Sequence, residues 1–337
     1  MKAWRIGTFG VEQLEQVEIA MPVPGPRDVL VRIHAVSLNF RDLLMVKGLY
    51  NPKMALPRIP CSDGAGEIVE VGSEVQGWKV GDRVAGIFMQ NWLDGNLTAA
   101  KSRGALGGDI DGMLAEYVAL PAEGVVAVPA HLTYGEAATL PCAAVTAWNA
   151  VNRAHQVRAG ETVVIQGTGG VSLFALQFAR LLGARVIGTS SSDEKLARAR
   201  KLDLDAGLNY RKQSDWASWV LEQTGGEGAD LIVEVGGAGT LQQSLKAVRF
   251  AGTIAQIGIL TGNEEKLPIG PMLHKQIRIQ AISVGSRQDF LDMNRAISHS
   301  KLKPAIGNVF SFNSIKEALA TMEGGSHFGK IVIRITD

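Results

Sequence analysis

The sequence predicts an α/β protein of two domains, in which a doubly wound parallel sheet is inserted between two parts of an antiparallel-rich domain. Three observations lead to this prediction. The chain of 337 residues is too long for one ordinary domain. Its first third has short alternating segments broken by turns, whereas its middle alternates short apolar segments with helical patterns. The last segment, Lys330–Ile335, alternates like the first third and returns the chain to the antiparallel domain.

The composition excludes several classes of protein. Apolar residues make up 46% and charged residues 20% of the chain, which allows a large core and argues against disorder. Lys and Arg number 34 against 33 Asp and Glu, so neither nucleic acid nor an anionic membrane is expected as a partner. The two cysteines, Cys61 and Cys142, cannot build a disulfide framework or a four-cysteine zinc lobe. With no signal core and no apolar run near the ~20 residues that cross a bilayer, we expect a cytoplasmic protein.

The antiparallel part begins with strands and one long loop. Val29–Val36 alternates apolar and polar residues as a half-buried strand does. Gly64–Val71 and Arg83–Phe88 are predicted as further strands. The segment Gln90–Gly112 is rich in glycine and has no periodicity, which predicts a long loop. Loops of that length are usually functional or mobile.

The middle of the chain alternates strands with helices. Thr162–Gln166 is a continuous apolar strand, Gly170–Leu182 carries a helical apolar face, and Arg185–Thr189 is a second strand. The alternation continues to Thr253–Ile257, and this order is typical of a parallel, doubly wound sheet. Ile277–Ser283 is predicted as one more strand. The predicted domains are residues 1–130, 131–264 and 265–337, the last holding the edge of the parallel sheet and the return to the antiparallel domain.

The clearest local motif is a glycine turn between the first strand and the first helix of this region. Gly167 permits the tight turn, and Gly169 lets the backbone approach a pyrophosphate. The N–H groups at the start of the helix then face the negative charge. Ser172 stands at the third glycine position and is still small enough for close packing. We therefore predict a dinucleotide site formed by Gly167, Thr168, Gly169, Gly170 and Val171.

The end of the second strand indicates which dinucleotide is bound. An NAD site usually has a carboxylate there for the ribose 2′-hydroxyl, whereas this chain has Ser190 followed by Ser191. A serine leaves room for a 2′-phosphate, and Lys195 can supply charge, although a lone lysine is more commonly a solvated helix residue. Tyr210 and Arg211 follow the third strand. The pattern favours NADP(H), with NAD(H) as the open alternative.

Several short motifs occur in order along nearly the whole chain. They are Val36–Asp42, Gly48–Tyr50, Asp63–Val69, Gly77–Val84, Leu140–Trp148 and Gly329–Ile333. Together they resemble the medium-chain dehydrogenase/reductase superfamily, specifically its zinc-free NADPH:quinone oxidoreductase-like branch. The resemblance implies a GroES-like catalytic domain and a Rossmann domain, with the active site in the cleft between them. It also implies a homodimer that pairs the strand matching Ile277–Ser283 with its twin.

The resemblance further implies the roles of individual residues. It assigns Asn39 and Tyr50 to a polar wall against the acceptor, and it places Asp42 in the same catalytic group as an organiser of the loop. The additional cofactor-binding residues that it implies are Thr146, Val235, Gly236, Ile257, Gly258, Ser283 and Lys330.

Zinc is not expected. The zinc-containing relatives use two cysteines and a histidine, often with a nearby glutamate, and the matching positions here are Asn39, Cys142, Ser62 and Asp63. One cysteine cannot hold the ion. Without a metal to polarise an alcohol, the resemblance implies NADPH-dependent reduction of a quinone or an α,β-unsaturated carbonyl, whose conjugation delocalises the incoming charge. The alternatives are a zinc-type alcohol dehydrogenase and a non-catalytic NADPH-binding protein.

Overall fold

A computed structural model describes residues 1–335, which form two compact units. Unit 1 consists of Met1–Val145 together with the residues from Gly285 onward, and unit 2 consists of Thr146–Val284. The predicted α/β class is confirmed, with a largely antiparallel sheet in unit 1 and a parallel sheet in unit 2. Residues 131–145, which the sequence assigns to the parallel-sheet domain, cluster with unit 1. The edge strand of the parallel sheet lies at Arg278–Ala281, within the predicted segment 265–337.

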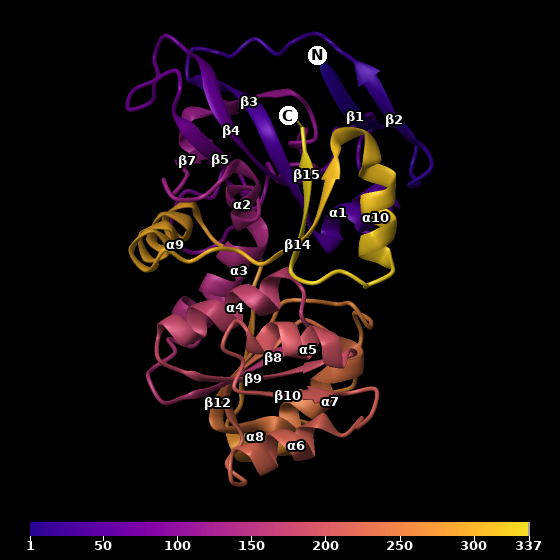
Figure 1. Cartoon of the computed structure of the whole chain (residues 1–337), viewed down its shortest axis with the longest axis vertical. Coiled ribbons are helices and arrows are strands. Elements are labelled where there is room, and N and C mark those ends of the chain that lie inside the picture. The colour runs from indigo at the N-terminus through magenta and orange to yellow at the C-terminus, as the bar shows by residue number, and fades with distance from the viewer. Residues whose placement is uncertain (336–337) are drawn as a thin grey trace. The chain divides into compact units, whose positions relative to one another are not determined.

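The main sheet of unit 1 has the strand order β14-β15-β3-β4-β5-β7, and β6 pairs with β3. The bounds of its strands are Asp28–Leu38 for β3, Asp63–Val71 for β4, Arg83–Gly86 for β5, Tyr117–Pro121 for β6, Val125–Ala127 for β7, Ile306–Ser311 for β14 and Lys330–Arg334 for β15. A smaller sheet pairs β1 (Lys2–Ile6) with β2 (Leu14–Glu18). Figure 1 shows the yellow β15 beside the indigo β3. Because Ile331 is in register with Leu38, this pairing brings Lys330 next to Asn39.

Alternation along β3 explains how unit 1 forms its core. Val31 and Ile33 are fully buried, whereas Arg32 and His34 between and beyond them are half-buried. Period-two alternation puts the apolar set on one face, where each fully buried side chain contributes about 1.5–3 kcal/mol. The helices of unit 1 are α1 (Phe40–Val46), α2 (Tyr134–Ala137), α9 (Arg287–Ser300) and α10 (Ile315–Glu323), with short 3₁₀ turns at Ala122–Gly124 and Phe312–Ser314. A π-helical turn, Leu140–Ala144, precedes α3 (Val145–Trp148) at the junction with unit 2.

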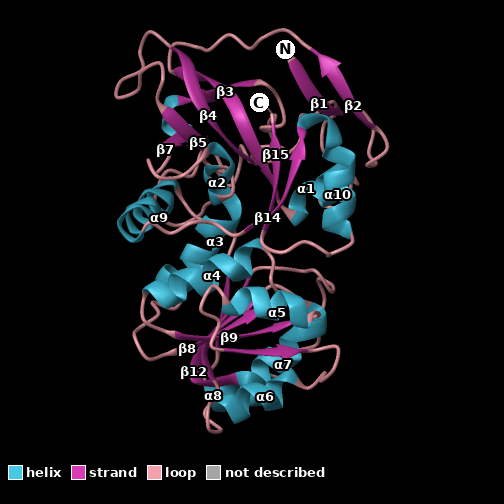
Figure 2. Ribbon diagram, viewed as in Figure 1, coloured by secondary structure: helices cyan, strands magenta, loops and turns pink. Residues whose placement is uncertain are grey.

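Unit 2 is a six-stranded parallel sheet with the order β10-β9-β8-β11-β12-β13. Its strands are β8 (Thr162–Gln166), β9 (Arg185–Ser190), β10 (Ala206–Asn209), β11 (Ala229–Glu234), β12 (Val248–Gln256) and β13 (Arg278–Ala281). Its helices are α4 (Gly170–Leu181), α5 (Asp193–Arg200), α6 (Trp216–Gln223), α7 (Ala238–Ala247) and α8 (Ile269–Lys275), preceded by the π-helical turn Asn149–Ala154. Figure 2 shows α4 and α5 on one side of this sheet and α6 and α8 on the other.

The strand order reverses between β8 and β11, because β9 lies on the opposite side of β8. In open α/β sheets, the crevice at the carboxyl ends of the strands on either side of such a switch point is where ligands bind. The residues that end β8 and β11 therefore lie where a ligand is expected.

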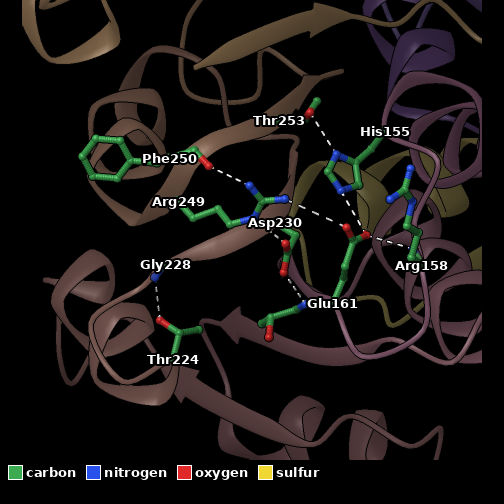
Figure 3. A network of polar contacts seen from close by, with 10 residues as sticks. His155, Arg158, Glu161, Thr224, Gly228, Asp230, Arg249, Phe250 and Thr253 are labelled. Carbon is green, nitrogen blue, oxygen red and sulfur yellow. Dashed lines mark hydrogen bonds and ion pairs between the residues drawn. The ribbon is translucent and has the colours of Figure 1, made fainter. Parts of the chain in front are cut away.

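A partly buried polar network fixes the opposite ends of the same strands (Figure 3). Asp230 in β11 accepts a hydrogen bond from the backbone N–H of Thr162 in β8, at 2.7 Å. His155 lies between the hydroxyl of Thr253 in β12, at 2.9 Å, and the carboxylate of Glu161, at 3.2 Å. Burial lowers the pKa of His155, which favours its neutral form. The network holds three strands in register at the end of the sheet away from the switch-point crevice. None of the helices in residues 1–335 is long and apolar enough to cross a membrane.

Candidate active site

The glycine turn at the end of β8 is open to a ligand. Gly167 has φ +70°, which favours glycine, and its N–H donates to the carbonyl of Thr189 at 2.8 Å. A Cβ added at Gly167 or Gly169 would meet no described atom within 4 Å. The N-terminus of α4 has no side-chain cap, so its N–H groups remain available to an anion. The hydroxyl of Ser172 donates to the carbonyl of Gln166 at 2.6 Å and ties the helix to the strand. These features fit a dinucleotide pyrophosphate.

Cationic side chains gather beyond the buried Ser190 at the end of β9. Ser192 caps α5 by accepting a hydrogen bond from the backbone N–H of Lys195, at 3.3 Å. Partial burial and the nearby positive charges of Arg198 and Arg211 lower the pKa of Lys195. Three cationic side chains this close together form a site suited to a phosphate.

The other residues around this end of the sheet are compatible with that charge. The N–H of Tyr210 donates to the carbonyl of Ser190 at 3.0 Å, and the residue is 42% exposed. Ser191 is half-buried. Asp193, the first acidic residue after β9, is paired with Lys212 at 2.6 Å and also accepts from the amide of Asn209. Its carboxylate is thus already engaged within the chain.

Two further predicted cofactor segments, after β11 and β12, are joined to the glycine turn by hydrogen bonds. Gln166 accepts from the N–H groups of Val235 and Gly236, both at 3.2 Å. The N–H groups of Ile257 and Gly258 donate to the carbonyl of Glu234, at 2.8 and 3.2 Å. The other two predicted residues of unit 2 lie at its ends. Thr146 is buried at the start of the unit, and Ser283 is exposed beyond the end of β13.

In unit 1, Asn39 lies in a buried cluster with Lys330. The backbone N–H of Asn39 donates to Oδ2 of Asp42 at 2.8 Å, which closes the start of α1. The ammonium of Lys330 donates to Oδ1 of Asn39 and to the carbonyl of Leu38, both at 2.6 Å. Because an ammonium only donates, it fixes the Asn39 amide with its oxygen toward Lys330 and its nitrogen away. The Asn39 amide nitrogen donates to the hydroxyl of Ser62 at 3.4 Å.

The cluster contains two buried carboxylates. Ser62 donates to Oδ1 of Asp63 at 2.7 Å, and the N–H of Cys142 donates to Oδ2 at 3.0 Å. Burial raises the pKa of Asp63, and the positive charge of Lys330 opposes that rise. Burial also raises the pKa of Asp42, to about 6, against the opposing charge of Arg41. The charge of Lys330 thus opposes the rise mainly for Asp63 and, after that of Arg41, also for Asp42.

The residues at the zinc positions lie together, but they do not fit the ion. The amide oxygen of Asn39 already accepts a hydrogen bond from Lys330, whose charge would repel a divalent cation. Burial and the charge of Asp63 raise the pKa of the Cys142 thiol, whereas zinc binds the thiolate. Across residues 1–335, no group of three or more His, Cys, Asp or Glu is arranged to hold a metal ion.

Arg41 connects Tyr50 to this cluster. The Arg41 guanidinium is 5.6 Å from the centre of the Tyr50 ring and 4.8 Å from that of Phe88. Arg41 also donates to the carbonyl of Leu106, at 2.9 Å, in the loop between β5 and β6. The structure thus gathers Asn39, Asp42 and Lys330, and it links the 56% exposed Tyr50 to them through Arg41. Lys330, which the resemblance assigns to the cofactor, is 3% exposed within unit 1.

Comparison with known proteins matches both units. Residues 25–130 match the family model of the alcohol dehydrogenase GroES-like domain, and residues 170–299 match that of the zinc-binding dehydrogenases. A zinc-type alcohol dehydrogenase-like protein of Schizosaccharomyces pombe is 44% identical over 97% of this chain and 96% of its own length. Other curated relatives are named as alcohol dehydrogenases or acryloyl-coenzyme A reductases.

Solved structures agree on the fold. A candidate alcohol dehydrogenase from Sinorhizobium meliloti has a TM-score of 0.92 and 43% identity, covering 99% of this chain and 98% of its own. A quinone oxidoreductase from Pseudomonas syringae has a TM-score of 0.84 and 28% identity, covering 99% of each chain. An NAD-dependent alcohol dehydrogenase is also among the similar structures. The chain therefore belongs to the medium-chain dehydrogenase/reductase superfamily and is an oxidoreductase of that type.

Proposed function

We propose that this enzyme reduces quinones or α,β-unsaturated carbonyls with NADPH and without zinc. The observation that carries the proposal is the contact between Lys330 and Asn39, at 2.6 Å. Two uncharged polar side chains, a protonated thiol and a carboxylate occupy the positions that hold a zinc ion in other members, and the ammonium of Lys330 donates to one of them. This donor set can offer an amide N–H to an acceptor, but it cannot supply the Lewis acid that alcohol oxidation requires.

The cofactor half of the site is proposed in unit 2. Bound NADPH would supply the hydride. The free N–H groups at the start of α4 would bind its pyrophosphate, at the turn that begins with Gly167. Lys195 and Arg211 would face its 2′-phosphate, with Ser190 leaving the necessary room. The rest of the proposed cofactor-binding set is Thr146, Ser191, Tyr210, Val235, Gly236, Ile257, Gly258, Ser283 and Lys330.

The acceptor half is proposed in unit 1. The Asn39 amide nitrogen, held away from Lys330, would donate to the carbonyl oxygen on which negative charge develops. Tyr50 would bound the same region as a polar wall. A conjugated acceptor spreads the arriving charge over its own π-system, so a neutral N–H donor is enough to support it.

The alternative function is a zinc-type alcohol dehydrogenase. The name of the Schizosaccharomyces pombe relative and the family model over residues 170–299 favour it. The chemistry of Asn39, Ser62 and Lys330 disfavours it, because two of these side chains are poor zinc ligands and the third carries positive charge.

A panel of acceptors tests the proposed function directly. Following NADPH oxidation, we expect turnover with para-benzoquinone and with enones, and little with simple aldehydes and ketones. Chelators should leave the rates unchanged. Zinc-dependent oxidation of simple alcohols, with no quinone turnover, would establish the alternative.

A second prediction concerns the choice of dinucleotide. Ser190→Asp should raise the Kd for NADPH about tenfold or more, because the new carboxylate repels the 2′-phosphate. The Kd for NADH in the same variant should stay within about threefold or improve. Both constants are measured at one fixed salt concentration, with Ser190→Ala as the uncharged control. Equal or tighter NADH binding by the unaltered enzyme would contradict NADPH preference.

We also propose a homodimer that pairs β13 with its twin. β13 is the last strand in the sheet order, and most of its residues are exposed. Ile259, Leu260, Ile269 and Leu273, which are apolar and at least half exposed, belong to the neighbouring segments. An open sheet edge beside apolar side chains is typical of an interface. Sedimentation at micromolar concentration should give about twice the 35.9 kDa mass of the chain, and a clean monomer would refute the dimer.

A further inference from the structure

We propose that Glu234 is a cofactor-positioning residue, which acts through Gln166 to couple the glycine turn to the loops after β11 and β12. The inference rests on the proposed use of NADPH. Neither residue is part of the predicted site, and neither would need to touch the cofactor.

The two residues lie at the switch point of the parallel sheet. Gln166 is the last residue of β8 and Glu234 is the last residue of β11, and these strands are neighbours. Gln166 is 5% exposed and Glu234 is fully buried. The Nε2 of Gln166 donates to Oε2 of Glu234 at 2.6 Å, so this hydrogen bond spans the two strand ends that flank the expected ligand crevice.

One oxygen of Glu234 organises the start of α7. Oε1 accepts from the N–H groups of Gly236 and Gly237, at 2.8 and 3.0 Å, and from the hydroxyl of Thr240 at 2.5 Å. The carboxylate therefore caps the turn that leads into this helix, where negative charge is favoured. Neutral hydrogen-bond donors stabilise the charge of this buried carboxylate. Its stability therefore depends on the positions of these donors.

The other oxygen sets the orientation of Gln166. Oε2 accepts from Gln166 and from the hydroxyl of Ser244. Since a carboxylate only accepts, it holds Nε2 of Gln166 toward itself and leaves Oε1 for the N–H groups of Val235 and Gly236. The backbone of Gln166 meanwhile accepts from Ser172 on α4. Glu234 thus orients the side chain of Gln166 toward the loop after β11, while the backbone of Gln166 ties the same strand end to the first turn of α4.

Glu234→Gln tests this coupling, because it keeps the shape of the side chain and replaces one accepting oxygen by a donating NH₂ group. Its new NH₂ group must face either the donors at the start of α7 or the NH₂ group of Gln166. In the second case the hydroxyl of Ser244, which donates to Oε2 and accepts from Nε2 of Gln166 at 3.1 Å, must also turn. If Gln166 rotates to relieve that conflict, its own NH₂ group turns against the N–H groups of Val235 and Gly236. Either way, buried donors lose their acceptor and the loop must move.

The double variant E234Q/Q166E should restore the pattern. The carboxylate at position 166 would accept from Val235 and Gly236 with one oxygen and from the amide at position 234 with the other. The amide oxygen at position 234 would accept from Gly236, Gly237 and Thr240, as the carboxylate does now. The negative charge then lies at position 166 instead of position 234, and every buried donor again has an acceptor.

The experiment measures the Kd of NADPH by its fluorescence at fixed salt for the full-length chain. We expect E234Q and Q166E each to weaken NADPH binding about 10- to 100-fold. The double variant should return to within about threefold of the unaltered enzyme. In steady state, the KM for NADPH should rise in E234Q while the KM for the quinone stays unchanged. Glu222→Gln, on the exposed surface of α6, is the matched control and should have no effect.

Each outcome bears on the inference. Recovery in the double variant supports it, because a merely destabilising change at Glu234 would not be rescued by placing a second altered side chain in the core. If E234Q does not fold, Thr240→Val removes a single donor and should weaken NADPH binding about two- to fivefold. Unchanged NADPH affinity in folded E234Q, or in Thr240→Val, would overturn the coupling while leaving the proposed function intact. Failure of the unaltered enzyme to bind NADPH would instead overturn both.

Discussion

Replacing Lys330 with Met should destabilise unit 1 strongly at alkaline pH and only weakly at acidic pH. The ammonium is 3% exposed and donates to Leu38 and Asn39, and its charge favours the ionised forms of Asp42 and Asp63. Removing one partner of a buried charge cluster costs about 3–5 kcal/mol when the remaining carboxylates are ionised. Protonation removes that charge, so the cost should shrink as the pH falls.

The sign follows from the raised pKa values of the two acids. In the unaltered protein, burial raises the pKa of Asp42 from 3.8 to about 6, so the folded form binds this proton more tightly than the unfolded chain does. The stabilisation from this proton is complete below pH 3.8 and is lost as the pH rises through about 6. Loss of Lys330 should raise the pKa of both acids further. The difference in stability between Lys330→Met and the unaltered protein should therefore grow above that pH.

Thermal melting between pH 5 and pH 8 measures this effect. The melting temperature of Lys330→Met should fall further below that of the unaltered protein at each step up in pH. Lys53→Met is the control, since Lys53 is an exposed lysine of the same unit and should show no such trend. A loss of equal size at every pH would mean that Lys330 acts through packing rather than through its charge.

Local patterns predicted most of the secondary structure of unit 2. Thr162–Gln166 was predicted as a strand from its apolar run and has the same bounds in the structure. The glycine turn could also be predicted, because a positive φ at Gly167 and a helix starting at Gly170 depend on neighbouring residues alone. The domain limit near residue 131 was not predictable in this way. Short helical turns such as Tyr134–Ala137 do not reveal which of two cores they join.

These local patterns could not predict which side chains distant in sequence contact one another. Asn39 and Lys330 meet because β15 pairs with β3 in one register, and no periodicity encodes that register across the intervening chain. Glu234 could have been noticed as an acidic residue within an apolar run. Its partner Gln166 lies at the end of another strand, however, and only the sheet order brings the two together.

Asn39→Ala should lower turnover on quinones about 100-fold while the Kd for NADPH stays within about twofold. Loss of one hydrogen-bond donor to a developing oxyanion costs about 10²–10³ in rate, and a quinone should lie at the lower end because it delocalises its own charge. The Kd for NADPH is expected to stay unchanged, because the glycine turn and the cations near Ser190 belong to unit 2. The purified protein should contain no stoichiometric zinc.

Asn39→Asp separates the N–H donor from the support that Asn39 gives to Lys330. A carboxylate at this position still accepts from the Lys330 ammonium and still begins α1. Because it adds a third buried acid beside Asp42 and Asp63, the melting temperature of the variant is measured first to establish that it is folded. The carboxylate has no N–H to offer, and its charge opposes that of the developing oxyanion, so the turnover of the variant should be at least as low as that of Asn39→Ala. If Asn39→Asp turned over quinones at the unaltered rate, Asn39 would serve only to hold Lys330. If turnover of the unaltered enzyme depended on added zinc, the metal-free site would be the wrong interpretation of this cluster.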